Sequence, residues 1–396
     1  MNHMETQRQN RLLRNVLFVF FVSGAASQPL GSFIPFLRET YGFSYDLSGL
    51  LLSCQSAGNL AAVALTGFLP VWLGRRRSIL MTSIWMAAAY LIFSAGLGSP
   101  AALMAACLMT GVARGGNANF ANTMISTLPA EKASWGFNLL HGSFAIGALL
   151  SPALLVLCTT LLPREGWRLM AAGLCLLALV QAAVYLRMEL PEEPAKAGGR
   201  TVDLSFLRVR QFWLGNVMLL MYMSVEYAIM GWLVTYFQDA GILPRQYAHL
   251  MNSLLWLVIF CGRMGGAALS GRFPRERLLL ADGGGMLAFF LVMFFGRTPA
   301  LIILGMMGVG LFMATIYPLC FAISSDSIKG NDLGCSVMLL TGSAGGMITP
   351  AVVGFVSERA GIRSGMALVL ALTAALLAAI VVSVVIAGRQ RSRRAE

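Results

Sequence analysis

The chain has 396 residues, of which 57% are hydrophobic and 12% are charged, with a formal net charge of +12. Soluble domains carry about 25% charged residues, so this composition excludes an ordinary soluble protein and indicates a membrane protein. Water is absent from the bilayer core, so long apolar stretches there have to fold as helices that satisfy their own backbone groups.

Twelve apolar stretches of helical length follow one another along the chain. Six are expected at residues 16–37, 46–70, 78–97, 100–126, 136–161 and 166–187. Six more are expected at 212–237, 247–270, 278–296, 299–325, 333–357 and 364–387. Each approaches or exceeds the about 20 residues that cross a bilayer. Residues 1–15 are polar and basic, and the apolar stretch after them is long enough to span, so we expect no cleavable signal peptide.

Positive charge is distributed unevenly between the two sides that these spans define. Twenty of the 29 Lys and Arg residues fall on the side of both termini, and seven fall on the other side. The richer side comprises Arg8 to Arg14, Arg75 to Arg77, Lys132, Arg187 to Arg210, Arg272 to Arg277, Lys329 and Arg389 to Arg394. Such an excess marks cytoplasmic loops. We therefore expect a multi-pass protein of a bacterial inner membrane with cytoplasmic termini, and no nucleic-acid partner.

One long polar segment interrupts the apolar stretches and divides them six and six. It predicts an N-terminal six-helix bundle over 1–187, a cytoplasmic linker over 188–211 and a C-terminal six-helix bundle over 212–396. An internal repeat with a period of about 200 residues supports this division. Gly142, Ser143, Pro152 and the loop Arg75 to Arg77 correspond to Gly342, Ser343, Pro350 and the loop Arg275 to Arg277. Two similar halves are typical of transporters that work by alternating access.

The segment GFLPVWLGRRRSIL, from Gly67 to Leu80, resembles the loop 2–3 signature of the major facilitator superfamily. The matching residues are Gly67, Gly74, Arg75 and Arg76, while Val71 occupies the acidic position of the signature. The resemblance implies an all-α membrane fold of 12 transmembrane helices in two six-helix bundles. It also implies that these residues belong to a cytoplasmic latch between the halves, which Val71 weakens.

Further segments resemble the fucose–galactose–glucose:proton symporters within that superfamily. They are NTMISTLP (122–129), NLLHGSFAIGALLSP (138–152), MSVEYAIMGWLVTYF (223–237), NSLLWLVIFCGRMGG (252–266) and MATIYPLCFA (313–322). The resemblance implies import of a sugar together with a proton. Gly31 and Ala118 stand where the group carries carboxylates in the first and fourth spans. The usual proton carriers are therefore absent, and another residue has to provide the coupling.

Two charged residues fall near the centre of spans, Arg114 in the fourth and Glu226 in the seventh. Charge inside the bilayer costs about 2.5–3.5 kcal/mol on insertion scales and is a functional hypothesis by default. Glu226 is the proton-coupling candidate, and a pair with Arg114 that forms in one state would shift its affinity for protons. Arg114 is a candidate for binding an anionic group, since guanidinium bonds carboxylate bidentately. The alternative is a fixed structural ion pair.

Polar and aromatic residues in otherwise apolar spans are the remaining substrate-binding candidates. They are Gln28, Asn117, Asn122, Asn138, His141, Tyr222, Tyr227, Asn252, Trp256 and Tyr317. Aromatic faces beside amide groups suit a sugar ring, whereas interhelical packing is the alternative. His141 is also a proton-relay candidate, because its unperturbed pKa is about 6.5. Arg263, near the end of the eighth span, is interpreted as a snorkelling side chain.

The sequence favours a proton-coupled importer of a small polar solute, a sugar or sugar derivative, that works as a monomer. The alternatives are an exporter of organic anions or drugs with Arg114 as its anion anchor, and an uncoupled facilitator. We expect no enzyme activity, because no nucleophile–base constellation is evident. No cofactor or metal is expected either, since the seven Cys are scattered without a CxxC pair and no Walker motif occurs.

Overall fold

The computed structural model describes residues 3–190, 204–270, 272–328 and 332–395. Within these ranges all regular structure is helical, with fourteen α-helices and one short 3-10 helix. The predicted all-α fold is confirmed.

Seven helices make up the first half of the chain. They are α1 (His3–Ser27), α2 (Pro29–Tyr41), α3 (Tyr45–Leu73), α4 (Arg75–Ala95), α5 (Pro100–Ser126), α6 (Ala130–Leu161) and α7 (Gly166–Arg187). α1 and α2 together form one stretch that is long and apolar enough to cross a membrane, over Gln7–Tyr41. The seven helices therefore account for six crossings. The bounds of α5 and α7 coincide with the predicted spans 100–126 and 166–187.

The second half repeats this plan. After the 3-10 helix η1 (Ser205–Arg208) come α8 (Arg210–Asp239), α9 (Arg245–Ser270), α10 (Arg275–Phe295), α11 (Pro299–Met313), α12 (Ile316–Ile328), α13 (Asp332–Ala360) and α14 (Ile362–Ala395). α11 and α12 form one apolar stretch, Pro299–Ser324. Nine such stretches are apolar enough to span among the described residues. α3, α5 and α9, of 29, 27 and 26 residues, are also long enough, which gives twelve crossings.

The repeat extends to the ends of the helices. α4 and α10 are 21 residues long each, and their first residues, Arg75 and Arg275, are 200 positions apart. α5 and α11 both begin with a proline after a hydroxyl residue that caps the helix. Ser99 accepts a hydrogen bond from the backbone N–H of Ala102, and Thr298 accepts one from that of Leu301.

The chain forms two compact units. Unit 1 comprises Met1–Phe43 and Leu50–Gly198, and unit 2 comprises Ser44–Gly49 and Gly199–Glu396. Most of the predicted linker 188–211 lies outside the described residues, so the predicted bundle boundaries stay a prediction.

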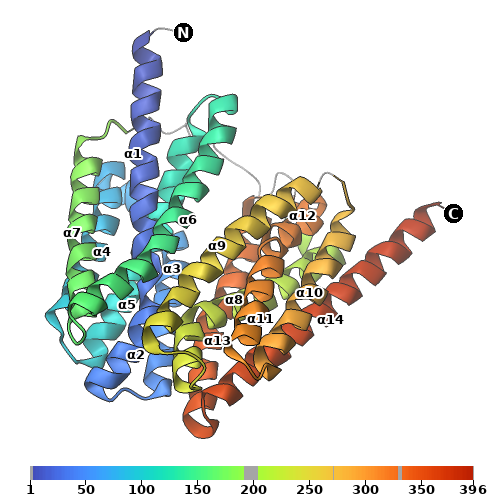
Figure 1. Cartoon of the computed structure of the whole chain (residues 1–396). Coiled ribbons are helices and arrows are strands. Elements are labelled where there is room, and N and C mark those ends of the chain that lie inside the picture. Colours follow the sequence, from blue (N-terminus) through green and yellow to red (C-terminus); the bar gives the residue numbers. More distant parts are fainter. Residues whose placement is uncertain (1–2, 191–203, 271, 329–331, 396) are drawn as a thin grey trace. The chain divides into compact units, whose positions relative to one another are not determined.

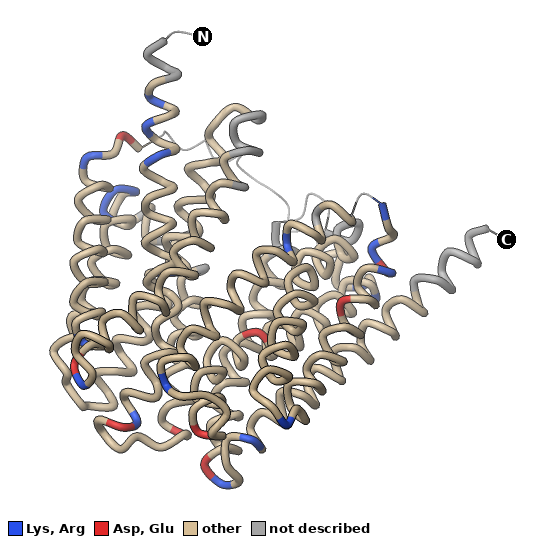
Figure 2. Tube along the Cα trace, viewed as in Figure 1, with Lys and Arg blue, Asp and Glu red and all other residues tan. Residues whose placement is uncertain are grey.

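Charged positions lie mainly near the ends of the helices, and long uncharged stretches separate them (Figure 2). This is the distribution that a bilayer imposes, because charge is tolerated where side chains reach the interface.

In unit 1, α1 packs against α5 and α6, and α4 lies between α5 and α7 (Figure 1). The core between these helices is apolar and includes Val19, Phe20, Phe120, Met124 and Leu140. In unit 2, α8 is the central helix and packs against α9, α12, α13 and α14. The indole Nε1–H of Trp232, fully buried on α8, donates to the Pro350 carbonyl on α13 at 3.1 Å.

The break between α1 and α2 follows from Pro29, which has no N–H to donate to the carbonyl of Ala25. The hydroxyl of Ser151 on α6 donates to this carbonyl at 2.7 Å. The hydroxyl of Tyr90 on α4 donates to the carbonyl of Ala26. Neighbouring helices thus satisfy the backbone groups at the proline, which is how prolines are tolerated inside a membrane.

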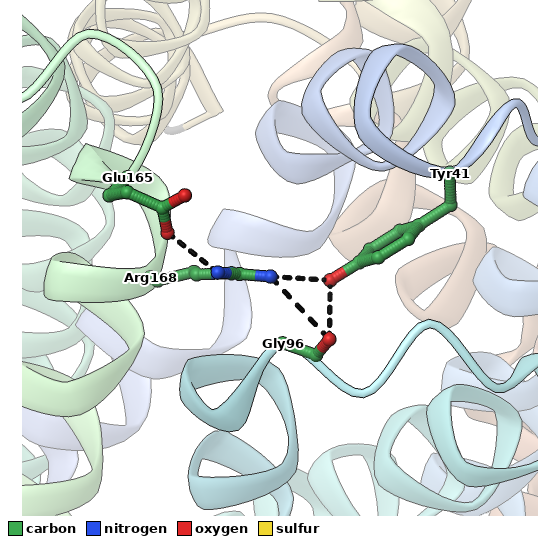
Figure 3. Close-up of polar contacts among 4 residues, drawn as sticks. All are labelled: Tyr41, Gly96, Glu165 and Arg168. Atoms are coloured by element: carbon green, nitrogen blue, oxygen red, sulfur yellow. Dashed lines mark hydrogen bonds and ion pairs between the residues drawn. The ribbon is translucent and has the colours of Figure 1, made fainter.

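A network of hydrogen bonds and one ion pair connects the ends of three helices in unit 1 (Figure 3). Arg168 on α7 pairs with Glu165 at 2.7 Å and donates to the hydroxyl of Tyr41, at the end of α2, at 3.0 Å. Tyr41 in turn donates to the carbonyl of Gly96, after α4, at 2.8 Å. Gly96 has a φ of 66°, in the left-handed region that glycine adopts without strain. The network therefore joins the ends of α2, α4 and α7.

Candidate functional site

Glu226 lies on α8 in unit 2 and is half-buried. Tyr222, one helical turn earlier on the same helix, is fully buried, and the charge of Glu226 acts on its hydroxyl. Positions four apart on a helix are neighbours, so α8 itself sets this contact.

Aromatic rings from α12 cover the same side of α8. The ring centroids of Tyr222 and Tyr317 are 6.3 Å apart, and those of Tyr317 and Phe321 are 5.2 Å apart. The charge of Glu226 acts on the hydroxyl of Tyr317 as well as on that of Tyr222. The rings therefore form an aromatic group whose two tyrosine hydroxyls are within electrostatic reach of one carboxylate.

Arg263 on α9 belongs to this group. Its positive charge acts on the hydroxyls of both Tyr222 and Tyr317. The snorkelling interpretation explained its exposed side chain but missed this electrostatic role. We call Tyr222, Glu226, Arg263 and Tyr317 the Glu226 cluster.

One face of α9 carries a row of polar and aromatic residues that ends at the Glu226 cluster. His249, Asn252, Trp256 and Arg263 recur at intervals of three, four and seven residues, so they share a helix face. His249 is buried, with its Nε2 atom 3.3 Å from Nε2 of Gln238. Sequence reasoning did not single it out, although the spacing to Asn252 was a visible signal.

Asn252 is the most informative residue of this row. Its side chain is 0% exposed, and within the described part of the chain neither amide atom has a hydrogen-bond partner. A buried polar group left unpaired costs about 1–3 kcal/mol, so most are paired in folded proteins. The unpaired amide makes Asn252 a candidate ligand-binding residue, and Trp256 lies one turn away on the same face.

Three candidates of unit 1 lie on α5. Arg114 is half-buried on α5 and has polar contacts, whereas Asn117, one turn later, is fully buried. The Oδ1 atom of Asn117 lies 2.7 Å from Oγ1 of Thr82 on α4, a contact that joins two helices. Asn122 on α5 is half-buried. Arg114 belongs to unit 1 and Glu226 to unit 2, and a pair between them stays a hypothesis from the sequence.

The remaining candidates have local surroundings. Gln28, at the α1–α2 break, donates to Ser27 Oγ at 3.4 Å. His141 is exposed on α6, and its ring meets that of Phe20 edge-on at 5.9 Å. The side chain of Asn138 lies outside the described residues. Tyr227 is half-buried on α8, with its ring against Gly346 of α13.

The motif from Gly67 to Arg76 bridges α3 and α4. Gly74 adopts a φ of 77° between the two helices, a left-handed conformation that favours glycine. Arg76 donates to the carbonyls of Tyr185, Leu186 and Met188 at the end of α7. A cation at a helix C-terminus satisfies unpaired carbonyls, so Arg76 has a structural role inside unit 1. A latch formed by Gly67, Gly74, Arg75 and Arg76 stays a prediction.

Asp282 is a charge inside a span that sequence reasoning overlooked. It lies on α10, is half-buried, and accepts a hydrogen bond from the hydroxyl of Thr315. A lone carboxylate in the apolar segment LLLADGGGMLAFF was the available signal. Among the described residues, no His, Cys, Asp and Glu side chains gather in a group of three that could hold a metal ion.

A model of the Major Facilitator Superfamily matches residues 16–334. The membrane protein MosC of Rhizobium meliloti is 23% identical over 356 residues, which cover 88% of this chain and 84% of MosC.

Three solved structures share the fold. A bacterial homologue of the human lysosomal transporter Spinster has a TM-score of 0.79 at 14% identity, covering 94% of this chain and 96% of its own. The nucleoside transporter NupG has a TM-score of 0.78 at 15% identity, with 94% and 99% covered. The Escherichia coli fucose:proton symporter FucP has a TM-score of 0.63 at 18% identity, with 94% and 98% covered. At such identities these likenesses concern the fold alone.

Proposed function

The chain belongs to the major facilitator superfamily and is therefore a multi-pass membrane transporter and not an enzyme. We propose that it imports a sugar or sugar derivative by proton-coupled alternating access. The observation that carries this proposal is the fully buried, unpaired amide of Asn252 on the face of α9 that ends at the Glu226 cluster.

The chemistry of this face fits a neutral polyol ring. Trp256 and Tyr317 offer aromatic faces to the C–H side of a sugar, and Asn252 offers one donor and one acceptor to its hydroxyls. A site built to bond hydroxyls discriminates strongly against ligands that lack them, because its own polar groups would be left unpaired. The solved nucleoside and fucose transporters, which share the fold, make a hydroxylated solute a natural candidate.

Glu226 is the proposed proton carrier. Its carboxylate interacts electrostatically with the hydroxyls of Tyr222 and Tyr317, and the positive charge of Arg263 acts on the same two hydroxyls. A solute or a conformational change that alters the distance to Arg263 would change the affinity of Glu226 for protons. Proton binding and solute binding would then be linked thermodynamically, as coupling requires.

A binding experiment tests the solute class. The purified protein is heated with neutral sugars, nucleosides, sugar acids and other organic anions, since a ligand of the folded state raises the melting temperature by mass action. Asn252→Leu should abolish the shift given by a neutral sugar. Gln181→Leu is the matched control, because Gln181 is a fully buried amide of unit 1 that bonds to Ser83 at 3.0 Å. A sugar shift that survives Asn252→Leu contradicts the assigned site.

A transport experiment tests the coupling. In proteoliposomes, Glu226→Gln should abolish accumulation of the solute against its gradient and spare exchange between labelled and unlabelled solute. Uphill uptake that persists in this variant would refute Glu226 as the carrier. Loss of both activities together would instead place Glu226 in solute binding.

Two alternatives have support of their own. Arg263 in the Glu226 cluster and Arg114 on α5 are cations that could hold an organic anion, as an exporter of anions or drugs would need. A melting shift given by anions and lost in Arg114→Gln or Arg263→Gln would favour this alternative. A protein that equilibrates its solute and never accumulates it would be an uncoupled facilitator.

We also propose a bacterial inner-membrane location with cytoplasmic termini and a monomeric state. The excess of Lys and Arg on one side of the spans supports the orientation. Protease accessibility of tags at each terminus in sealed vesicles would test it.

A further inference from the structure

The two units contain corresponding polar contacts between neighbouring helices. In unit 1, Thr82 on α4 meets Asn117 on α5, and in unit 2 Asp282 on α10 meets Thr315, between α11 and α12. Thr82 and Asp282 are 200 positions apart, and Asn117 and Thr315 are 198 apart, so the repeat places both contacts at the same point of the fold. The contact is neutral in unit 1 and contains a carboxylate in unit 2.

Asp282 lies inside a membrane-spanning helix. It is seven residues, about 10 Å, beyond the start of α10. Its single hydrogen-bond partner among the described residues is the hydroxyl of Thr315, and no described cation forms an ion pair with it. An ionised carboxylate inside a bilayer with one neutral partner is costly, and such residues are functional candidates by default.

The helices packed against α10 bring few charged residues to the level of Asp282. α11 has no charged residue, and α14 faces Gly283 with Leu377 and Ile380. The described titratable residues of α12 are Tyr317 and Cys320, and the charged residues of α10 itself, from Arg275 to Arg277, lie in its first turn. The side chain of Asp326 lies outside the described residues.

Thr315 stands at an interruption of the helix. Ala314 and Thr315 separate α11 from α12, because Pro318 has no N–H to donate to the carbonyl of Ala314. The carbonyl of Thr315 accepts from the N–H of Leu319 at 3.1 Å. Many helical threonines of this chain, such as Thr66 and Thr341, donate their hydroxyls back to a carbonyl four residues earlier. The hydroxyl of Thr315 instead donates to the carboxylate of Asp282 on the neighbouring helix α10. The bond to the Asp282 carboxylate therefore replaces the hydrogen bond that a helical threonine ordinarily donates to a carbonyl of its own helix.

Two glycines of α9 pack closely against Ala314 and Thr315, which form the joint between α11 and α12. A Cβ atom at Gly266 would lie 2.0 Å from Cγ2 of Thr315, and one at Gly262 would lie 2.8 Å from Cβ of Ala314. Arg263 stands between these glycines, and Tyr317 lies two residues beyond Thr315. The joint between α11 and α12 is thus adjacent to two members of the Glu226 cluster.

We infer that Asp282 is a second proton-binding residue of the transporter, which links protonation to the joint between α11 and α12. A proton from the aqueous phase adds to a carboxylate oxygen of Asp282, and the resulting O–H donates to Thr315 Oγ1. The hydroxyl of Thr315 is then released to bond within its own helix. This inference rests on the proposed proton coupling, but it concerns a different residue.

Infrared difference spectroscopy of the full chain in lipid tests it without a known solute. Spectra recorded at acidic and alkaline pH display a carbonyl band for each carboxylic acid that is protonated between them. Asp282→Asn should remove one band that Glu226→Gln leaves in place. Thr315→Val should move the same band to higher frequency, because the acid loses a hydrogen bond. Thr82→Val, the repeat-related change in unit 1, should leave it unmoved.

The outcomes separate the two proposals. A spectrum unchanged by Asp282→Asn and Thr315→Val overturns the inference, even if Glu226→Gln removes a band and the proposed carrier stands. Loss of a band in Asp282→Asn with no band assigned to Glu226 leaves the inference in place and contradicts the proposed carrier. If Asp282→Asn fails to fold, the response of the band to Thr315→Val decides the question.

Discussion

The crossing of α3 and α5 makes a quantitative prediction for Gly111→Ala. A Cβ atom at Gly111 would lie 1.9 Å from the carbonyl oxygen of Gln55 and 2.8 Å from the backbone nitrogen of Asn59. Ordinary contact begins at 3.4 Å, so the Gln55 oxygen would have to retreat by the difference, 1.5 Å. Both clashing atoms belong to the backbone of α3, so no change of rotamer relieves them.

The retreat also loosens neighbouring contacts of the same crossing. A Cβ at Gly58 would lie 2.1 Å from the Leu108 carbonyl oxygen, and one at Gly115 would lie 2.6 Å from Ala62 Cβ. Gly111 and Gly115 form a GxxxG pattern, which permits close approach of membrane helices. Overpacking costs about 1–3 kcal/mol, and we expect a loss of about 2 kcal/mol in the free energy of unfolding.

Gly173→Ala provides the matched control. Gly173 lies on α7, and a Cβ there would meet nothing within 4 Å. Alanine is the better helix former by about 0.8–1.0 kcal/mol, so this variant should equal or exceed the wild type in stability. Titration with SDS in mixed micelles, followed by circular dichroism, measures both. Equal unfolding midpoints for the two variants would refute the close crossing.

Two further predictions use the same titration. Arg168→Gln should lower the free energy of unfolding by about 1–2 kcal/mol because it removes the bonds to Tyr41 and Gly96. Glu165→Gln should cost less than about 1 kcal/mol, since an exposed ion pair contributes little, and equal losses would contradict this division. Trp232→Phe keeps a buried ring but leaves a carbonyl of α13 without its donor. It should cost about 1–2 kcal/mol, and unchanged stability would mean that the bond has no net value.

The spans could be predicted from the sequence because a bilayer demands long apolar helices, and α5 and α7 end where composition changes. The interruption at Ala314 and Thr315 also had a visible signal, because Pro318 has no N–H to donate to the carbonyl of Ala314, four residues earlier. The first span was predicted as one helix although Pro29 was visible. The sequence alone does not show whether neighbouring helices satisfy the carbonyls that a proline leaves without a donor. Those neighbours come from distant parts of the chain.

The candidate site was predictable in its residue types and less so in its contacts. Glu226, Tyr222 and Tyr317 stood out as polar or aromatic residues in apolar spans. The association of Arg263 with them depends on the rotation of α9 about its axis, which depth in the membrane does not determine. The hydrogen bond between Asp282 and Thr315 depends in the same way on how α10 and α12 face each other.

The proline break in the first span has a consequence for how the protein is made. The first span leaves the ribosome before the helices that complete it, and the carbonyls of Ala25 and Ala26 have no partner at that stage. Tyr90 is synthesised 64 residues after Ala26, and Ser151 is synthesised 126 residues after Ala25. The nascent first span therefore lacks these two donors until α4 and α6 have been synthesised. Membrane insertion of this segment is thus completed by helices that are translated much later.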